Sequence, residues 1–113
     1  MSHSRWKTIR ERKITEGFTE PAEVAEARYE IRLSMALAKA VHDRRTALGL
    51  TQAQLAERAG LTQAKISRIE RSDTVPTLPL LAKLARALDA SLDISLDDDS
   101  TRVAFTAHHS DAA

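Results

Sequence analysis

The chain has 113 residues, of which 42% are hydrophobic and 4% aromatic, so it has the size of one domain with a modest core filled mainly by Ala and Leu. The absence of cysteine excludes disulfide bonds and thiolate metal sites, and no long apolar run predicts a membrane span or a signal peptide, so a cytoplasmic location is expected. The net charge of +1 is unevenly distributed: residues 1–88 hold 16 Lys and Arg against 10 Asp and Glu, whereas residues 89–113 hold one Arg against six Asp. The basic first part of the chain can therefore still bind a polyanionic partner.

Residues 1–20 form a polar extension of mixed charge with a few scattered apolar side chains. Two of the four aromatic residues of the chain, Trp6 and Phe18, lie in this extension. A frayed terminus is one interpretation, because chain ends are commonly poorly ordered. The other is a segment that docks on a partner, because two large aromatic side chains would otherwise pack against nothing.

A long helical pattern begins at Pro21 and runs to about Leu48. Proline suits a first helical turn, and Glu23 and Glu26 favour the positive end of the helix dipole. Apolar residues at helical spacing predict a core-facing stripe made of Tyr29, Leu33, Ala36, Leu37, Ala40, Val41 and Leu48. A second apolar set on another side of this helix consists of Ile31, Met35 and Ala38. Either neighbouring elements cover this second set, or residues 22–36 contact another chain.

The next stretch, residues 50–71, contains two helix-start signals eleven residues apart. Thr51 is placed to cap the first helix, and Gln54 completes a capping box with it. Gly60 is placed to end that helix in a left-handed conformation, and Thr62 is placed to cap the second helix. The pattern predicts a helix-turn-helix whose inward residues are Leu55, Ala56, Ile66 and Ile69.

A loop over residues 72–76 is followed by a fourth predicted helix, which Thr77 caps and Asp89-Ala90 ends. Its predicted inward residues are Leu78, Leu81, Leu84, Ala85 and Leu88. Alternating apolar residues then predict a β-hairpin over 91–107 with a polar turn over 97–100, which should pack on the helices or on a partner's strand. The predicted organisation is an extension over 1–20, a helical domain over 21–90, the hairpin over 91–107 and a disordered tail over 108–113.

The segment TQAQLAERAGLTQAKISRIE resembles the helix-turn-helix of the phage-repressor-like (XRE) DNA-binding family. The small Ala56, the turn at Gly60 and the apolar Ile66 carry the resemblance. It implies a mainly α, lambda-repressor-like helix-turn-helix bundle, here with a long N-terminal helix and a C-terminal β-hairpin. It also implies that the second helix of the motif enters the major groove of an operator, and that two copies bind the halves of a palindromic site.

Matching the motif position by position places the base-reading sites of the family on Gln63, Ala64 and Arg68. Gln suits adenine, Arg suits guanine and the Ala methyl suits thymine. Gln52 matches a residue that helps to hold a phosphate. The flanking residues of the implied DNA site are Thr62, Lys65, Ser67 and Arg71. The alternative for each of these residues is an ordinary solvated position on a helix.

Arg45 and Glu70 match a partly buried ion pair of related repressors, which joins the first helix to the second helix of the motif. The resemblance therefore implies a structural role for both residues. Removing one partner should destabilise the fold more than breaking a surface pair, because it leaves a buried charge without its counterion.

The outer parts of the chain are similar to antitoxins of the HigA type, which pair with small basic RelE/HigB-like ribonuclease toxins. The similarity rests on the start SRWKTIRERK, the long Ala/Arg-rich helix and the closing hairpin. It implies toxin neutralisation and repression of the protein's own operon, with Trp6, Phe18, Ile31 and Met35 at the partner interface. Many such relatives carry Gly-Gly before the hairpin, where this chain has Asp89-Ala90-Ser91, so the geometry at the entry of the hairpin is open.

Two other functions fit the same residues: a stand-alone XRE-family regulator without a toxin, and an interaction module that no longer binds DNA. The basic residues around the second helix of the motif argue against the module. His3, His42, His108 and His109 lack the spacing of a metal site, and Asp97-Asp98-Asp99 reads as a solvated turn rather than a magnesium cluster. We therefore expect neither an enzyme nor a cofactor.

Overall fold

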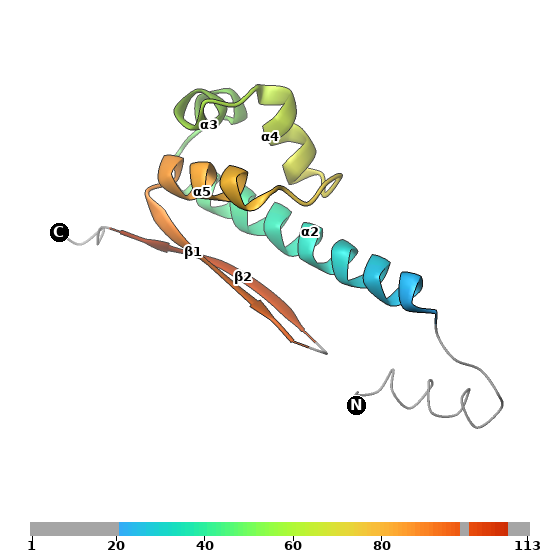
Figure 1. Ribbon diagram of the computed structural model, residues 1–113. Helices are drawn as coiled ribbons and strands as arrows, with labels where there is room; N and C mark the ends of the chain where they lie inside the picture. Colours follow the sequence, from blue (N-terminus) through green and yellow to red (C-terminus); the bar gives the residue numbers. More distant parts are fainter. Residues whose placement is uncertain (1–20, 98–99, 109–113) are drawn as a thin grey trace.

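The computed structural model describes residues 21–97 and 100–108, and in this part of the chain it consists of four helices followed by a β-hairpin (Figure 1). Predictions for Trp6, Phe18, the rest of residues 1–20, Asp98, Asp99 and residues 109–113 lie outside the described residues. The predicted fold class is confirmed. The elements are α2 (Ala22–Ala47), α3 (Gln52–Ala59), α4 (Gln63–Glu70), α5 (Leu78–Ala87), β1 (Ala90–Leu96) and β2 (Thr101–Ala107).

The core lies where α3, α4 and α5 meet the C-terminal half of α2, while the N-terminal half of α2 extends beyond the bundle (Figure 1). Its largest fully buried side chains are Leu37, Val41, Leu55, Ile66, Ile69, Leu84 and Leu88. All of them are aliphatic, and burying such a side chain contributes about 1.5–3 kcal/mol. Small residues, Ala56 among them, fill the space between the helices, which lets the two helices of the motif pack closely.

The predicted caps at the starts of α3, α4 and α5 and the predicted end of α3 are confirmed. Thr51 accepts a hydrogen bond from the backbone N–H of Gln54, whose side chain accepts one from the backbone N–H of Thr51, so the capping box is complete. Gly60 has a φ of 70°, in the left-handed region, and ends α3. Thr62 and Thr77 cap α4 and α5 through their hydroxyl groups. These caps fix where the helices begin and end through residues within a few positions of each end.

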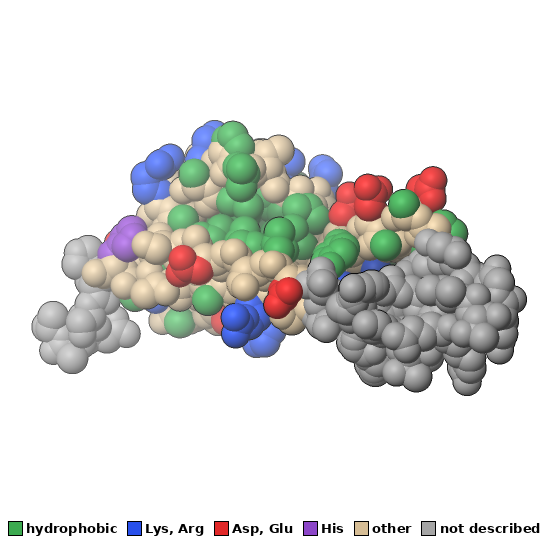
Figure 2. Space-filling view, turned by 60° about the horizontal axis from the view of Figure 1, so that its bottom comes forward, with side chains coloured by type: hydrophobic (Ala, Val, Ile, Leu, Met, Phe, Trp, Pro, Cys, Tyr) green, Lys and Arg blue, Asp and Glu red, His purple; other side chains and the backbone are tan. Residues whose placement is uncertain are grey.

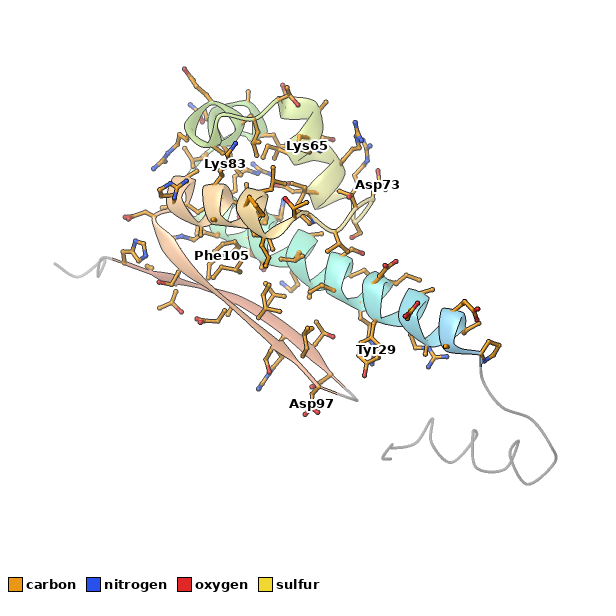
Figure 3. All side chains as sticks on the ribbon, viewed as in Figure 1. Tyr29, Lys65, Asp73, Lys83, Asp97 and Phe105 are labelled. Atoms are coloured by element: carbon orange, nitrogen blue, oxygen red, sulfur yellow. The ribbon has the colours of Figure 1, made fainter. Side chains whose placement is uncertain are left out.

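Two predictions for α2 are wrong. Tyr29 and Leu48 were assigned to the core stripe, but each is 37% exposed. Ala38 of the second apolar set is buried, which is one of the two alternatives for that set. Tyr29 lies on the part of α2 that extends past the bundle, where its hydroxyl donates to the carbonyl oxygen of Asp97 at 3.4 Å (Figure 3). Leu48 lies in the capping turn after α2. Helical periodicity identifies a face of a helix, but it does not show how far along that face the neighbours reach.

Predictions at both ends of α5 are also corrected. Leu78 was expected to face inward but is 77% exposed, because it is the first residue of α5 and lies at the rim of the bundle. Ala90 was expected to end the helix, but it is buried and begins β1. His108 was assigned to a disordered tail, yet its backbone N–H donates to the carbonyl oxygen of Asp89 at 3.0 Å. The hairpin therefore starts one residue earlier and is anchored one residue later than predicted.

The hairpin packs on α2 through β2 and on α5 through β1 (Figure 1). The strands are antiparallel, with Leu92 opposite Phe105 and Ile94 opposite Val103, and these four side chains face the helices. Asp89 turns the chain from α5 into β1 with a φ of 53°, so a non-glycine residue adopts the left-handed conformation here. Arg44 of α2 stabilises this turn by donating to the carbonyl oxygens of Leu88 and Asp89.

Candidate nucleic-acid interface

The outer surface of α4 presents the residues that the sequence assigns to base reading. Gln63, Ala64 and Arg68 are exposed, while Lys65 and Ser67 are half-buried. Opposite them, Ile66 and Ile69 are fully buried, so the inner side of α4 is fixed to the core. A helix held in this way presents its outer side chains in a defined orientation, which is what reading of base edges in a groove requires.

The start of α4 also has the general properties of a helix N-terminus. The hydroxyl of Thr62 accepts a hydrogen bond from the backbone N–H of Lys65 at 3.1 Å. Earlier N–H groups of the first turn have no partner within the helix, as at any α-helix N-terminus, and such groups favour anions. The hydroxyl of Thr62 therefore serves as a cap, while the first turn itself is suited to approach a phosphate.

The basic side chains near α4 differ in their environments. Arg71 donates to Asp73 Oδ2 at 3.0 Å and to Ser67 Oγ at 3.2 Å, so an acidic neighbour offsets part of its charge. Asp73 lies in the loop after α4, and Lys65 projects from α4 itself (Figure 3). Within the part of the chain that the structure describes, Arg68 makes no ion pair. Arg68 is therefore better placed than Arg71 to contact a nucleic acid.

The structure brings Arg45 and Glu70 together as a nearly buried ion pair. Arg45 Nε donates to Glu70 Oε2 at 2.6 Å, and Arg45 Nη2 donates to Glu70 Oε1 at 2.9 Å. The side chains are 11% and 6% exposed, respectively. Arg45 Nη1 also donates to the carbonyl oxygen of Leu50, just before α3. One guanidinium thus joins α2, the start of the motif and the end of α4.

Two further side chains, which no sequence-based prediction placed here, complete this network. Gln52 Nε2 donates to Glu70 Oε1 at 3.2 Å, and His42 Nδ1 lies 3.2 Å from the same oxygen. The amide of Gln52, predicted to hold a phosphate, is thus also tied to the ion pair. The one sequence signal for His42 is its position three residues before Arg45, on the same side of α2.

The surroundings of Glu70 shift its acid equilibrium. Burial alone acts to raise the pKa of Glu70, but hydrogen bonds from Arg45, Gln52 and His42 outweigh burial and hold that pKa below its usual value. The hydrogen bond to Glu70 in turn raises the pKa of the Arg45 guanidinium. Both groups therefore carry full charge at neutral pH.

The predicted partner interface lies on another part of the molecule. Ile31 and Met35 are each 57% exposed on α2, and Val24 nearer its start is also exposed. The exposed charged residues on the same part of α2 are acidic: Glu23, Glu26 and Glu30. The same segment carries the half-buried Arg28 and Arg32, and Ile31 lines a hollow with residues 72–75, so the predicted partner interface adjoins the loop after α4.

The described residues offer little support for other kinds of site. No group of three His, Cys, Asp or Glu side chains in residues 21–97 and 100–108 is arranged to hold a metal ion. None of the helices in those ranges is long and apolar enough to cross a membrane. The outer side of α4 is therefore the part of the described chain in which exposure, orientation and charge together suit a ligand.

Comparison with known proteins points to the same segment. Residues 41–95 match the helix-turn-helix family HTH_3. The chain is 44% identical over 48 residues to an uncharacterized HTH-type transcriptional regulator of Methanothermobacter thermautotrophicus, covering 42% of this chain and 70% of that protein.

Two solved structures are similar in fold. The HTH_3 family transcriptional regulator of Vibrio cholerae matches with a TM-score of 0.54 at 29% identity, over 55% of this chain and 35% of that one. The wild-type restriction-modification controller protein C.Esp1396I matches with a TM-score of 0.51 at 29% identity, over 52% of this chain and 77% of that one. This chain thus spans about a third of the Vibrio protein, and the similarity lies in the helix-turn-helix.

Proposed function

The chain belongs to the HTH_3 (XRE) family of helix-turn-helix transcriptional regulators, and from this premise we propose that it binds a specific operator through α4 and represses its own operon. The observation that carries the proposal is the orientation of α4. Its inner residues are locked in the core, while Gln63, Ala64 and Arg68 are exposed on its outer side. A rigid helix with a basic and an amide side chain on its open surface suits the major groove.

Each predicted residue has a role in this proposal. Gln63 makes paired hydrogen bonds to adenine, Arg68 donates hydrogen bonds to guanine, and the methyl of Ala64 contacts the methyl of thymine. Lys65, Ser67 and Arg71 flank the reading residues and position the backbone. Gln52 joins the phosphate contacts at the start of α3, while its amide also steadies Glu70.

The experiment is a salt titration of binding to a fluorescent duplex taken from the promoter of the protein's own operon. Contacts to phosphates release counterions, so the affinity should fall steeply as salt increases. A scrambled duplex of equal length is the control, and the operator duplex should bind more tightly at every salt concentration. Absence of binding, or a flat salt dependence, would instead favour a protein-interaction module that no longer binds DNA.

A second function is supported by the exposed surface of α2. We propose that the protein is also an antitoxin that binds a small basic RelE/HigB-like ribonuclease through Ile31 and Met35, with Trp6 and Phe18 of the N-terminal extension. The two described residues are large, apolar and more than half exposed. Glu26 and Glu30 are exposed on the same part of α2, where Arg28 and Arg32 are half-buried, and these exposed carboxylates suit a basic partner. The alternative is a stand-alone regulator without a toxin.

This second function is tested by capture from the native host, followed by an assay of the captured protein. A small basic protein recovered in near-stoichiometric amount should cleave RNA when freed and be inhibited when the chain is added back. The double variant Ile31→Asp, Met35→Asp should lose the capture, while Leu96→Asp, an exposed change on the hairpin, should keep it. Recovery of the chain alone would favour the stand-alone regulator.

A further inference from the structure

Three side chains compete for one carboxylate oxygen, Oε1 of Glu70. Arg45 Nη2 donates to this oxygen at 2.9 Å and Gln52 Nε2 at 3.2 Å, while the ring nitrogen Nδ1 of His42 lies 3.2 Å from it. One carboxylate oxygen offers about two lone-pair sites. A third donor therefore weakens one of the other two hydrogen bonds, so a change at His42 is felt by Gln52.

The contact that His42 makes depends on the charge of its ring. Nδ1 lies 3.2 Å from Arg45 Nη2 as well as from Glu70 Oε1. A neutral ring can accept from Arg45 or donate to Glu70, depending on which nitrogen carries the proton, whereas a charged ring can only donate to Glu70. Histidine is the side chain that ordinarily changes its charge between pH 5 and pH 8. The network therefore has two arrangements, and protonation of the ring selects one of them.

The charged groups around His42 leave this choice to Arg45 and Glu70. Arg45 faces the ring from the same helix and Glu70 faces it from α4. Lys39 and Asp43, the nearby charged residues of α2, pair with each other at 2.6 Å. The His42 side chain is 54% exposed, so protons reach it from water. Among the described residues, the charge of the ring thus acts on the ion pair and, through Glu70, on Gln52.

We propose that His42 is a positioning residue for operator binding, because its charge controls how firmly Glu70 holds the amide of Gln52. A charged ring donates to a carboxylate more strongly than a neutral amide does. The hydrogen bond from Gln52 then weakens, and the amide becomes free to donate to a phosphate at the start of α3. The operator should therefore bind more tightly as the pH falls from 8 to 6. The inference rests on the proposed operator binding and adds the residue that regulates it.

Lysine and arginine side chains do not supply such a pH dependence. They keep their charge between pH 6 and pH 8, so those that gather along the upper edge of the molecule in Figure 2 attract DNA equally at both values. The other histidine of the described residues is His108, at the end of the hairpin. It contacts Asp89 and Ser91 and no member of the network, so it provides a matched control.

The test measures the operator affinity of the full-length chain at pH 8 and pH 6, by fluorescence anisotropy at fixed salt. The wild type should gain about fivefold at pH 6 for each subunit of a homodimer, which is the coupling usual within one hydrogen-bond network. His42→Asn should lose this gain, because asparagine places an amide near the position of Nδ1 but does not titrate. His108→Asn should keep the gain. Equal gains in the wild type and His42→Asn would overturn the inference.

A double variant separates positioning of Gln52 from direct attraction of DNA by the charged ring. Gln52→Ala removes the amide that His42 is proposed to control. In this background His42→Asn should leave the ratio of the affinities at pH 6 and pH 8 unchanged. If His42→Asn lowers that ratio as much in Gln52→Ala as in the wild type, the ring acts on DNA through its charge alone, and the positioning role is refuted.

A readout without DNA separates this inference from the proposed function. The side-chain amide signal of Gln52 in a ¹⁵N-correlated NMR spectrum should move between pH 8 and pH 6 in the wild type and stay in place in His42→Asn. A stationary wild-type signal would overturn the inference, and operator binding by that protein would leave the proposed function standing. Conversely, a signal that moves in a protein that binds no operator would support the coupling of His42 to Gln52 and refute operator binding.

Discussion

The guanidinium of Arg45 on α2 holds the carboxylate of Glu70 at the end of α4 through hydrogen bonds of 2.6 and 2.9 Å. Both side chains are nearly buried, so water competes little for either group. The pair fixes the end of α4 relative to the long helix, while Ile66 and Ile69 fix its inner side. The orientation of the proposed DNA-reading surface thus depends on a charged contact as well as on packing.

Glu70→Ala should destabilise the protein by about 3 kcal/mol, because it leaves the guanidinium of Arg45 buried without its counterion. Thermal unfolding followed by circular dichroism measures the effect as a lower melting temperature. Glu57→Ala, an exposed change on α3, is the control and should change stability by less than about 0.5 kcal/mol. An unchanged melting curve for Glu70→Ala would show that the ion pair does not stabilise the fold.

The ion pair between Arg45 and Glu70 should make the free energy of unfolding decrease in acid. The pKa of Glu70 lies below its usual value of 4.5 in the folded protein, so between the two values the unfolded chain binds the proton more readily. The stabilisation is therefore complete above about pH 5 and is lost as the pH falls through the folded pKa. Melting temperatures measured from pH 7 to pH 3 should fall more steeply for the wild type than for Glu70→Gln. Parallel curves would contradict this assignment.

Because Asp89 has a left-handed conformation, alanine and glycine substitutions at this turn should have different effects on stability. Asp89→Ala should destabilise the fold by about 1 kcal/mol, because alanine tolerates a φ of 53° less well than aspartate does. Asp89→Gly relieves the left-handed strain, and the exposed contact with His108 that both variants lose contributes little, so Asp89→Gly should unfold at higher urea than Asp89→Ala. The reverse order of the two urea midpoints would show that the carboxylate, rather than the backbone, sets this turn.

Local signals in the sequence predict the motif well. Thr51, Gln54, Gly60 and Thr62 act within a few residues of themselves, so their capping and turn roles can be inferred without the rest of the fold. The family resemblance added Arg45 and Glu70, which lie 25 residues apart in the chain. No local pattern predicts that contact.

Local sequence signals do not predict which parts of a helix its neighbours cover, or which turns distant side chains stabilise. The periodicity of α2 and α5 includes Tyr29 and Leu78, but both lie at the edge of the bundle, where they remain 37% and 77% exposed. The left-handed Asp89 was also missed, because its conformation depends on Arg44 of α2 contacting the backbone carbonyl groups of Leu88 and Asp89. His42 contacts Glu70 only because α2 packs against α4 in the folded chain.

The most direct test of the central claim compares Gln63→Ala and Arg68→Ala with the wild type on operator and scrambled duplexes, by fluorescence anisotropy at fixed salt. Each change should weaken operator binding by about 1–3 kcal/mol, with a much smaller effect on the scrambled duplex, because these side chains read bases. Lys83→Ala, an exposed cation on α5, is the control and should leave the ratio of the two affinities unchanged. An equal loss on both duplexes would mean that α4 contacts only the phosphate backbone, and would contradict the account.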